Sequence, residues 1–176
     1  MAIANPILNF VVRGLQALFG IVVLGISVSL IRGHHWGGLP ASLGFAASVG
    51  GVTILGAAIG VMAMFVSFLD GVVGLAIDGV IAIVNVAGGI LLALKLSGVN
   101  CTEATQDNFE KLVGNTIING GCRAKGDCWY FYNENNPETM ISRCKSTQAD
   151  DVFMFLTVAV LAVSGLLAFL RMKKGY

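Results

Sequence analysis

The stretch "AIDGVIAIVNVAGG", residues 76–89, places a carboxylate and an amide inside an otherwise apolar run. Asp78 and Asn85 stand seven residues apart in this run. The whole chain of 176 residues is 56% hydrophobic and only 12% charged, whereas soluble domains average roughly 45–50% apolar and about 25% charged residues. A small soluble core cannot bury such long apolar runs, so the sequence predicts an integral membrane protein.

Four segments of the chain are long and apolar enough to cross a bilayer, which requires about 20 residues for a core of about 30 Å. We expect transmembrane helices at residues 7–31, 39–68, 71–94 and 152–170. The second segment is longer than a vertical crossing needs and predicts a tilted or protruding helix. Short links make the first three helices antiparallel neighbours. The predicted fold is an all-α, four-helix transmembrane bundle: helices 1–3 in 1–94, a polar loop domain in 95–151, and helix 4 with a short tail in 152–176.

All four cysteines lie in the loop of residues 95–151. This confinement indicates an oxidising compartment and disulfide bonds, for which three pairings are possible. Cys101 closely follows the third helix and Cys144 closely precedes the fourth, so the helix ends favour a Cys101–Cys144 bond and leave Cys122–Cys128 as a tight inner loop. A zinc site is the alternative, but the loop has neither CxxC spacing nor histidine.

The orientation follows from the cysteines, because an extracellular or lumenal loop places both termini in the cytosol. Arg171, Lys173 and Lys174 at the C-terminal end then obey the positive-inside rule. The six Lys and Arg residues of the loop argue for the opposite orientation, and we give the cysteines more weight. The pair Lys173-Lys174 also matches a dilysine retrieval signal, which makes early secretory membranes one candidate location.

Two short motifs near the membrane have ordinary structural interpretations. Asn100-Cys101-Thr102 has the form of a glycosylation sequon, but its closeness to the membrane and the disulfide at its middle residue favour an unmodified asparagine. The histidines of "HHW", residues 34–36, lack a third metal ligand, and we expect Trp36 to anchor the membrane interface. The aromatic run 129–132 is expected to form the core of the loop or to lie at headgroup level.

Charged residues inside the predicted helices are candidates for a functional site. Arg13 and Asp78 each lie about seven residues into helices that start from the same side, hence at a common depth of roughly 10 Å. An Arg13–Asp78 pair would satisfy both charges and would determine how the first helix docks on the third. Asn85 lies two turns further along the face of Asp78, and Gln16 lies near Arg13. The cluster is either an ion pathway or a set of interhelical hydrogen bonds that fixes helix register; because it does not continue beyond Asn85, we favour the second interpretation.

Small residues form one row along the second helix. The members of this row, spaced by multiples of four, are Gly44, Ser48, Gly56 and Gly60. Such rows let helices approach closely. The sequence leaves open whether this row packs inside the bundle or against another copy of the chain.

Several function classes are excluded by what the sequence lacks. It contains no Ser-His-Asp set, phosphate-binding glycine-rich loop, HExxH motif or CxxC redox pair. We therefore expect no enzyme, no cofactor and no bound metal. A net charge of +1 without a basic patch also argues against nucleic acid as a partner.

Three stretches together resemble a known family. These are "PILNFVVRGLQALFGIVVLGISVSLI" (6–31), "AIDGVIAIVNVAGGILLALKL" (76–96) and "SRCKSTQADDVFMFLTVAVLAV" (142–163). They resemble fungal MARVEL-like proteins, especially the non-classical export protein family. The resemblance carries onto Arg13, Asp78, Asn85, Cys101, Cys144 and Gln148. The segment 103–140, with Cys122 and Cys128, is longer than the usual link of that family.

The resemblance implies a function that composition and spacing do not show. Members of the family organise lateral domains of the plasma membrane, sense or sort lipids, and associate with themselves or with other membrane proteins. Fungal members are tied to furrowed, eisosome-like domains rich in sterol and sphingolipid. We therefore expect a self-associating scaffold whose partners are membrane lipids and proteins. The alternative is a channel or transporter, or its accessory subunit, that uses Asp78 and Asn85.

Overall fold

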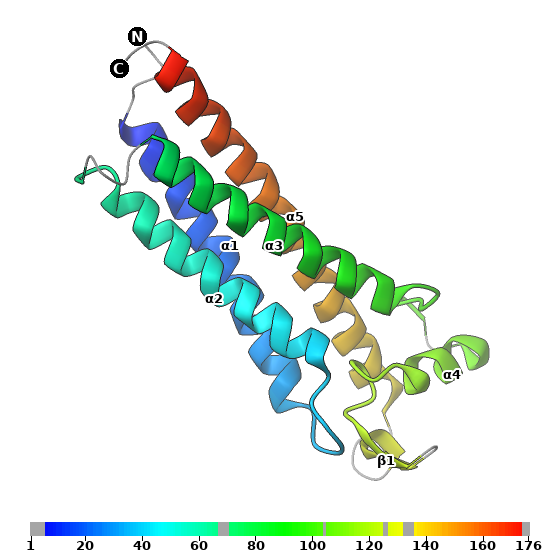
Figure 1. Cartoon of the computed structure of the whole chain (residues 1–176). Coiled ribbons are helices and arrows are strands. Elements are labelled where there is room, and N and C mark those ends of the chain that lie inside the picture. The colour runs from blue at the N-terminus through cyan, green and yellow to red at the C-terminus, as the bar shows by residue number, and fades with distance from the viewer. Residues whose placement is uncertain (1–5, 67–70, 104, 125–126, 132–135, 174–176) are drawn as a thin grey trace.

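The computed structural model describes residues 6–66, 71–103, 105–124, 127–131 and 136–173. Four long helices run side by side (Figure 1): α1 (Pro6–Arg32), α2 (Ala41–Met62), α3 (Val72–Leu96) and α5 (Pro137–Lys173). Each is long and apolar enough to cross a membrane. Between α3 and α5 the chain forms the short helix α4 (Gln106–Gly114) and the antiparallel pair β1 (Cys122–Ala124) and β2 (Asp127–Cys128). We call α4, β1, β2 and their connecting segments the cap.

The four long helices form a ring of contacts. Helix α1 packs on α2 and α5, and α3 also packs on α2 and α5, so α1 and α3 stand at opposite corners of the bundle. Helix α1 begins and α5 ends at the same end of the bundle, whereas the cap lies at the other end (Figure 1). The predicted four-helix membrane fold is confirmed.

Helix α5 begins much earlier than its hydropathy predicts. The first residue of the helix is Pro137 rather than Val152. The start signals are local: Asn136 accepts a hydrogen bond from the backbone N–H of Glu138 through its side-chain oxygen (2.9 Å), and proline is favoured at the first helical position. Hydropathy locates the apolar part of a helix and does not detect a polar extension of it. The last part of the expected loop 95–151 therefore belongs to α5.

Helix α2 is shorter than predicted. It ends at Met62 instead of continuing to residue 68; the last two residues of that expected range lie outside the described residues. The backbone then forms tighter bonds, such as Met64 N–H to the carbonyl of Val61 (3.1 Å), which close a helix with three-residue turns. Its 22 residues span about 33 Å, enough to cross a hydrocarbon core of about 30 Å.

The cap is joined to the bundle by a disulfide and by apolar contacts. Cys101, just after α3, is bonded to Cys144 of α5, and Cys122 is bonded to Cys128 across the β pair. Both predicted disulfides are therefore present. Ile117 of the cap is fully buried in the main core of the bundle. The other buried members of that core are Val23, Leu30, Leu43, Ala46, Val49, Leu92 and Met154.

The link between α1 and α2 lies against the cap. The indole rings of Trp36 and Trp129 meet edge to face with centroids 5.4 Å apart, and the Arg123 guanidinium stands 4.1 Å over the Trp36 ring. Gly121, at φ +96°, has no room for a Cβ because the Trp36 carbonyl oxygen occupies that position. Trp36 therefore contacts the cap, and its role as an anchor at the membrane interface stays a prediction. Tyr130 is buried in the cap core, and residue 132 lies outside the described residues.

Candidate functional site

The interior of the bundle, in the half away from the cap, contains a buried ion pair between diagonally opposite helices. Arg13 Nη1 and Nη2 of α1 donate to Asp78 Oδ1 and Oδ2 of α3 at 2.6 and 2.8 Å. The two residues are only 7% and 5% exposed. Two parallel bonds of this kind are the strongest arrangement of guanidinium and carboxylate. The structure thus places together the two charges that depth alone relates in the sequence.

The position of this pair corrects the expected docking of the first helix on the third. Helices α1 and α3 occupy opposite corners, and their main packing partners are α2 and α5. The Arg13–Asp78 pair crosses the bundle axis between them. It therefore acts as a tie across the bundle, through the space that α2 and α5 leave free.

One side chain of α5 and one of α1 complete the surroundings of the pair. Ser164 Oγ of α5 donates to Asp78 Oδ2 (2.9 Å), and Arg13 Nη1 also donates to Gln16 Oε1 (2.8 Å). The carboxylate thus accepts hydrogen bonds from two corners of the bundle. Among the described residues, only the Nε atom of Arg13 within this pair has no hydrogen-bond partner.

Two glycines of α2 make room for the pair and the layer beside it. A Cβ at Gly60 would overlap the guanidinium of Arg13, and a Cβ at Gly56 would overlap the side chain of Ile81. Both glycines are buried. This half of the small-residue row therefore packs inside its own chain.

The other half of that row faces outward. Ser48 is exposed and donates to the Gly44 carbonyl of its own helix (2.9 Å). A Cβ at Gly44 would meet nothing within 4 Å. The four small residues therefore do not share one function, and only these two are accessible to another molecule.

A layer of amides lies one step closer to the cap. Asn85 Nδ2 donates to Thr53 Oγ1 of α2 and to the carbonyl of Ile81 (both 2.9 Å). Gln16 Nε2 donates to the Thr53 carbonyl (3.3 Å). Asn85, Gln16 and Thr53 are all at most 1% exposed. The amides link α1, α2 and α3 at mid-bundle.

A second polar contact lies beyond an apolar layer. Val23, Val49 and Met154, all buried, occupy the core between the amide layer and the cap end. Past them, Ser27 Oγ of α1 donates to Asp150 Oδ2 of α5 (2.7 Å). Asp150 is fully buried, and its Oδ1 has no hydrogen-bond partner among the described residues.

Sequence reasoning missed four members of these clusters: Thr53, Ser164, Ser27 and Asp150. Serine and threonine give little signal, since hydropathy barely distinguishes them inside an apolar run. Asp150 lies two residues before the expected start of the fourth helix and therefore falls within the expected polar loop of residues 95–151. The helix-start signal at Asn136-Pro137 would have included Asp150 in the fourth long helix.

Arg143 holds the cap end of the bundle through backbone carbonyls. Its Nη1 donates to the carbonyl of Gly33 (2.6 Å), and its Nη2 donates to those of Ile117 (3.3 Å) and Leu30 (3.5 Å). The last carbonyls of a helix lack intrahelical partners, and a cation there is favourable. Arg143 thus joins the end of α1, α5 and the cap.

The remaining candidate residues lie at the surface. Asn100 is exposed, and its Oδ1 accepts hydrogen bonds from Thr102 N and Oγ1 at 2.9 and 2.6 Å; its glycosylation stays an untested prediction. Gln148 is exposed on α5. Within the described part of the chain, no group of three His, Cys, Asp or Glu residues is placed to hold a metal ion.

These features define a class: a four-helix membrane bundle whose intramembrane charges are paired internally and whose cap is disulfide-bonded. The family model of the MARVEL membrane-associating domain matches residues 6–167, and the chain belongs to the MARVEL family. Domains of this family are in general membrane-associating and non-catalytic. No curated protein and no solved structure matches the chain.

Proposed function

We propose that this protein is a non-enzymatic organiser of lateral plasma-membrane domains that associates with membrane lipids, with other membrane proteins and with itself. The observation that carries the proposal is that the central polar side chains of the spans are buried and bonded to one another. Arg13 is bonded to Asp78, and Asn85 to Thr53. What the bundle offers to its surroundings is therefore an apolar helical surface.

That outer surface supports a role in association. Large apolar side chains are exposed on all four long helices, where lipid tails or other apolar helices can contact them. Examples are Phe10 of α1, Leu55 of α2, Ile83 of α3 and Phe169 of α5, each at least 55% exposed. In a bilayer such contacts select partners by shape rather than by hydrophobic burial.

The finer assignments come from the resemblance to fungal non-classical export proteins. On that basis the lipids are sterols or sphingolipids and the domains are furrowed and eisosome-like. The cytosolic placement of both termini rests instead on the confinement of the cysteines to the loop of residues 95–151. Lys173 ends α5, while Lys174 lies outside the described residues. We assign Lys173 to positive-inside anchoring rather than to retrieval to early secretory membranes.

Self-association is proposed to use the open half of the small-residue row, Gly44 and Ser48. The first experiment is native mass spectrometry of the protein extracted gently with its own lipids. We expect a discrete homo-oligomer or a larger assembly that retains sterol or sphingolipid. The double variant Gly44→Leu/Ser48→Leu should shift it to monomer. Gly14→Leu, at another position with no atom within 4 Å of a Cβ, is the matched control. A wild-type monomer without retained lipid contradicts the proposal.

Transport through Asp78 and Asn85 is the competing function. The apolar layer of Val23, Val49 and Met154 separates these residues from Asp150, which argues against a polar path. Ion or proton flux in proteoliposomes that disappears in Asp78→Asn would favour transport. Loss of stability in that variant, with no flux in the wild type, would favour the structural role.

A further inference from the structure

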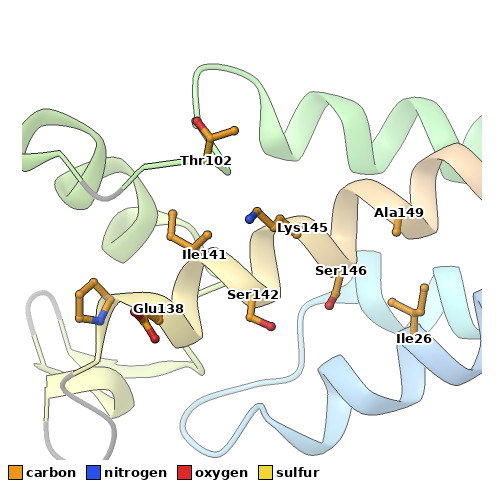
Figure 2. A pocket seen from close by; sticks show the side chains of 9 residues that line it. Ile26, Thr102, Glu138, Ile141, Ser142, Lys145, Ser146 and Ala149 are labelled. Carbon is orange, nitrogen blue, oxygen red and sulfur yellow. The ribbon is translucent and has the colours of Figure 1, made fainter.

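A groove of about 700 Å³ lies beside the cap end of α5, outside the polar clusters of the bundle. Figure 2 shows two rows of α5 side chains in it. Ser142 and Ser146 lie on the side of α5 nearer to α1, and Lys145 lies on the side nearer to Thr102 (Figure 2). Ile26 of α1 closes the groove at its end toward the bundle.

The chemistry of the groove changes in order along α5. Glu138 lies at the outer end, Lys145 lies two turns further, and Ala149 with Ile26 forms the apolar end. The step from Glu138 to Lys145 is about 10 Å along the axis at about 1.5 Å per residue. Ile26 lies within the apolar run of α1, so the side of the groove at Ile26 faces the bilayer; on α5, Asp150 and Asp151 separate Ala149 from the apolar run. From the bilayer outward, the charged side chains of the lining are Lys145 and then Glu138, with the apolar Ile141 between them along α5.

A zwitterionic phospholipid presents the complementary order. Its tails lie in the bilayer, its phosphate comes next, and its amine is outermost. Lys145 can meet the phosphate as a cation, with Ser142 and Ser146 as hydroxyl donors beside it. Glu138 can then meet the amine.

The type of amine follows from the lining. Quaternary ammonium groups are recognised by aromatic faces, and none of the described residues that line the groove is aromatic. A primary ammonium instead donates hydrogen bonds to a carboxylate, which Glu138 supplies. Glu138 also disfavours a headgroup with a second negative charge.

We propose that this groove binds the headgroup of phosphatidylethanolamine in the leaflet next to the cap. Lys145, Ser142 and Ser146 hold its phosphate, Glu138 accepts from its ammonium, and a tail lies along Ile26. The inference goes beyond the proposed association with sterols or sphingolipids by adding a glycerophospholipid that the protein recruits, and it rests on the proposed role as a membrane organiser. It does not depend on self-association.

The test is native mass spectrometry of the full chain titrated with phosphatidylethanolamine, phosphatidylcholine or phosphatidylglycerol of identical tails. Wild type should retain phosphatidylethanolamine best. Glu138→Gln should lower the retention of phosphatidylethanolamine roughly three- to tenfold, to the level of phosphatidylcholine, because charge-assisted bonds at partly exposed positions contribute about that much. Lys145→Ala should lower the retention of all three lipids. Lys111→Ala, which removes a cap lysine outside the groove, is the matched control and should change nothing.

A charge swap tests whether lipid binding depends on the order of the charges along the groove or only on their net charge. Glu138→Lys/Lys145→Glu keeps the composition and net charge but inverts the sequence of charges along the groove. It should bind as poorly as the single variants. Wild-type binding by the swap, or equal retention of the three lipids by wild type, overturns the proposal. Preference for phosphatidylglycerol would assign an anionic lipid and also overturns it. A monomer that still selects phosphatidylethanolamine sustains this site while contradicting self-association.

Discussion

The two ends of the bundle are held together by different chemistry. At the end away from the cap, a buried ion pair, Arg13–Asp78, ties opposite helices across the axis. At the cap end, a disulfide, the guanidinium of Arg143 on backbone carbonyls, and the Trp36–Trp129 contact hold the helices to the cap. Charged side chains surrounded by apolar helices are costly unless they pair with one another. An end of the bundle next to water can instead be held by a disulfide bond and by hydrogen bonds to backbone carbonyls. We therefore expect different substitutions to destabilise the two ends.

The largest effect is expected from breaking the buried ion pair. Asp78→Ala leaves the Arg13 guanidinium buried without its carboxylate, which should destabilise the protein by about 3–5 kcal/mol. Equilibrium unfolding in mixed micelles would measure it. Arg13→Ala should be comparable, and Arg13→Ala/Asp78→Ala should be less destabilised than the sum of the two. Lys95→Ala, at an exposed helix end, is the control. Strictly additive effects would show that the two residues do not interact.

Removal of the disulfide at the cap end should come next. Cys101→Ala/Cys144→Ala releases a loop with a sequence separation of 43 and should cost about 2–4 kcal/mol. Cys122→Ala/Cys128→Ala releases a separation of only 6 and should cost less, because a shorter loop gains less entropy when it is freed. The same unfolding assay applies. An equal or larger loss in the second pair would contradict this ranking.

Gly60, beside the ion pair, allows a sharper test of the packing at the end of the bundle away from the cap. Gly60→Ala must displace the guanidinium of Arg13 and should cost about 1–3 kcal/mol as an overpacked interior site. Gly44→Ala in the same helix meets no atom and should be neutral or stabilising by up to about 1 kcal/mol, since alanine favours the helix. If both variants behave alike, α2 does not contact Arg13.

The smallest effect is a pH dependence at the cap end. Burial lowers the pKa of His34, with Arg143 and His35 adding repulsion and a bond to the Gly38 carbonyl opposing the shift. His34 therefore binds a proton more readily when the link between α1 and α2 has separated from the cap than when the link is docked on it. Docking is at full strength above the unperturbed pKa of about 6.5 and weakens as pH falls below it.

The two tryptophans of the chain, Trp36 and Trp129, both lie in this contact, so their fluorescence reports it. We expect a shift toward solvent-exposed emission as the pH falls from 7.5 to 5.5, because His34 in the separated link binds protons below the unperturbed pKa of about 6.5 and the docked His34 resists protonation. In His34→Gln the emission should stay constant over that range. A response that persists in His34→Gln would assign the titration to another group.

Much of the architecture was determined by the sequence itself. Apolar runs of sufficient length predict four spans, because the bilayer requires them whatever the neighbours are. The position of Cys101 and Cys144 at two helix ends predicts their bond. Equal depth predicts the encounter of Arg13 and Asp78. Each of these inferences needs only the position of a residue within its own segment of the chain.

Other features were decided only by the tertiary structure. The diagonal placement of α1 and α3, the space that Gly60 leaves for Arg13, and the contact of Ser27 with Asp150 depend on which helix faces which. Hydropathy and small-residue spacing describe one helix at a time, and a row such as Gly44 to Gly60 twists relative to its neighbours, so its two halves meet different surroundings. Packing of the four helices therefore settles which polar groups become partners.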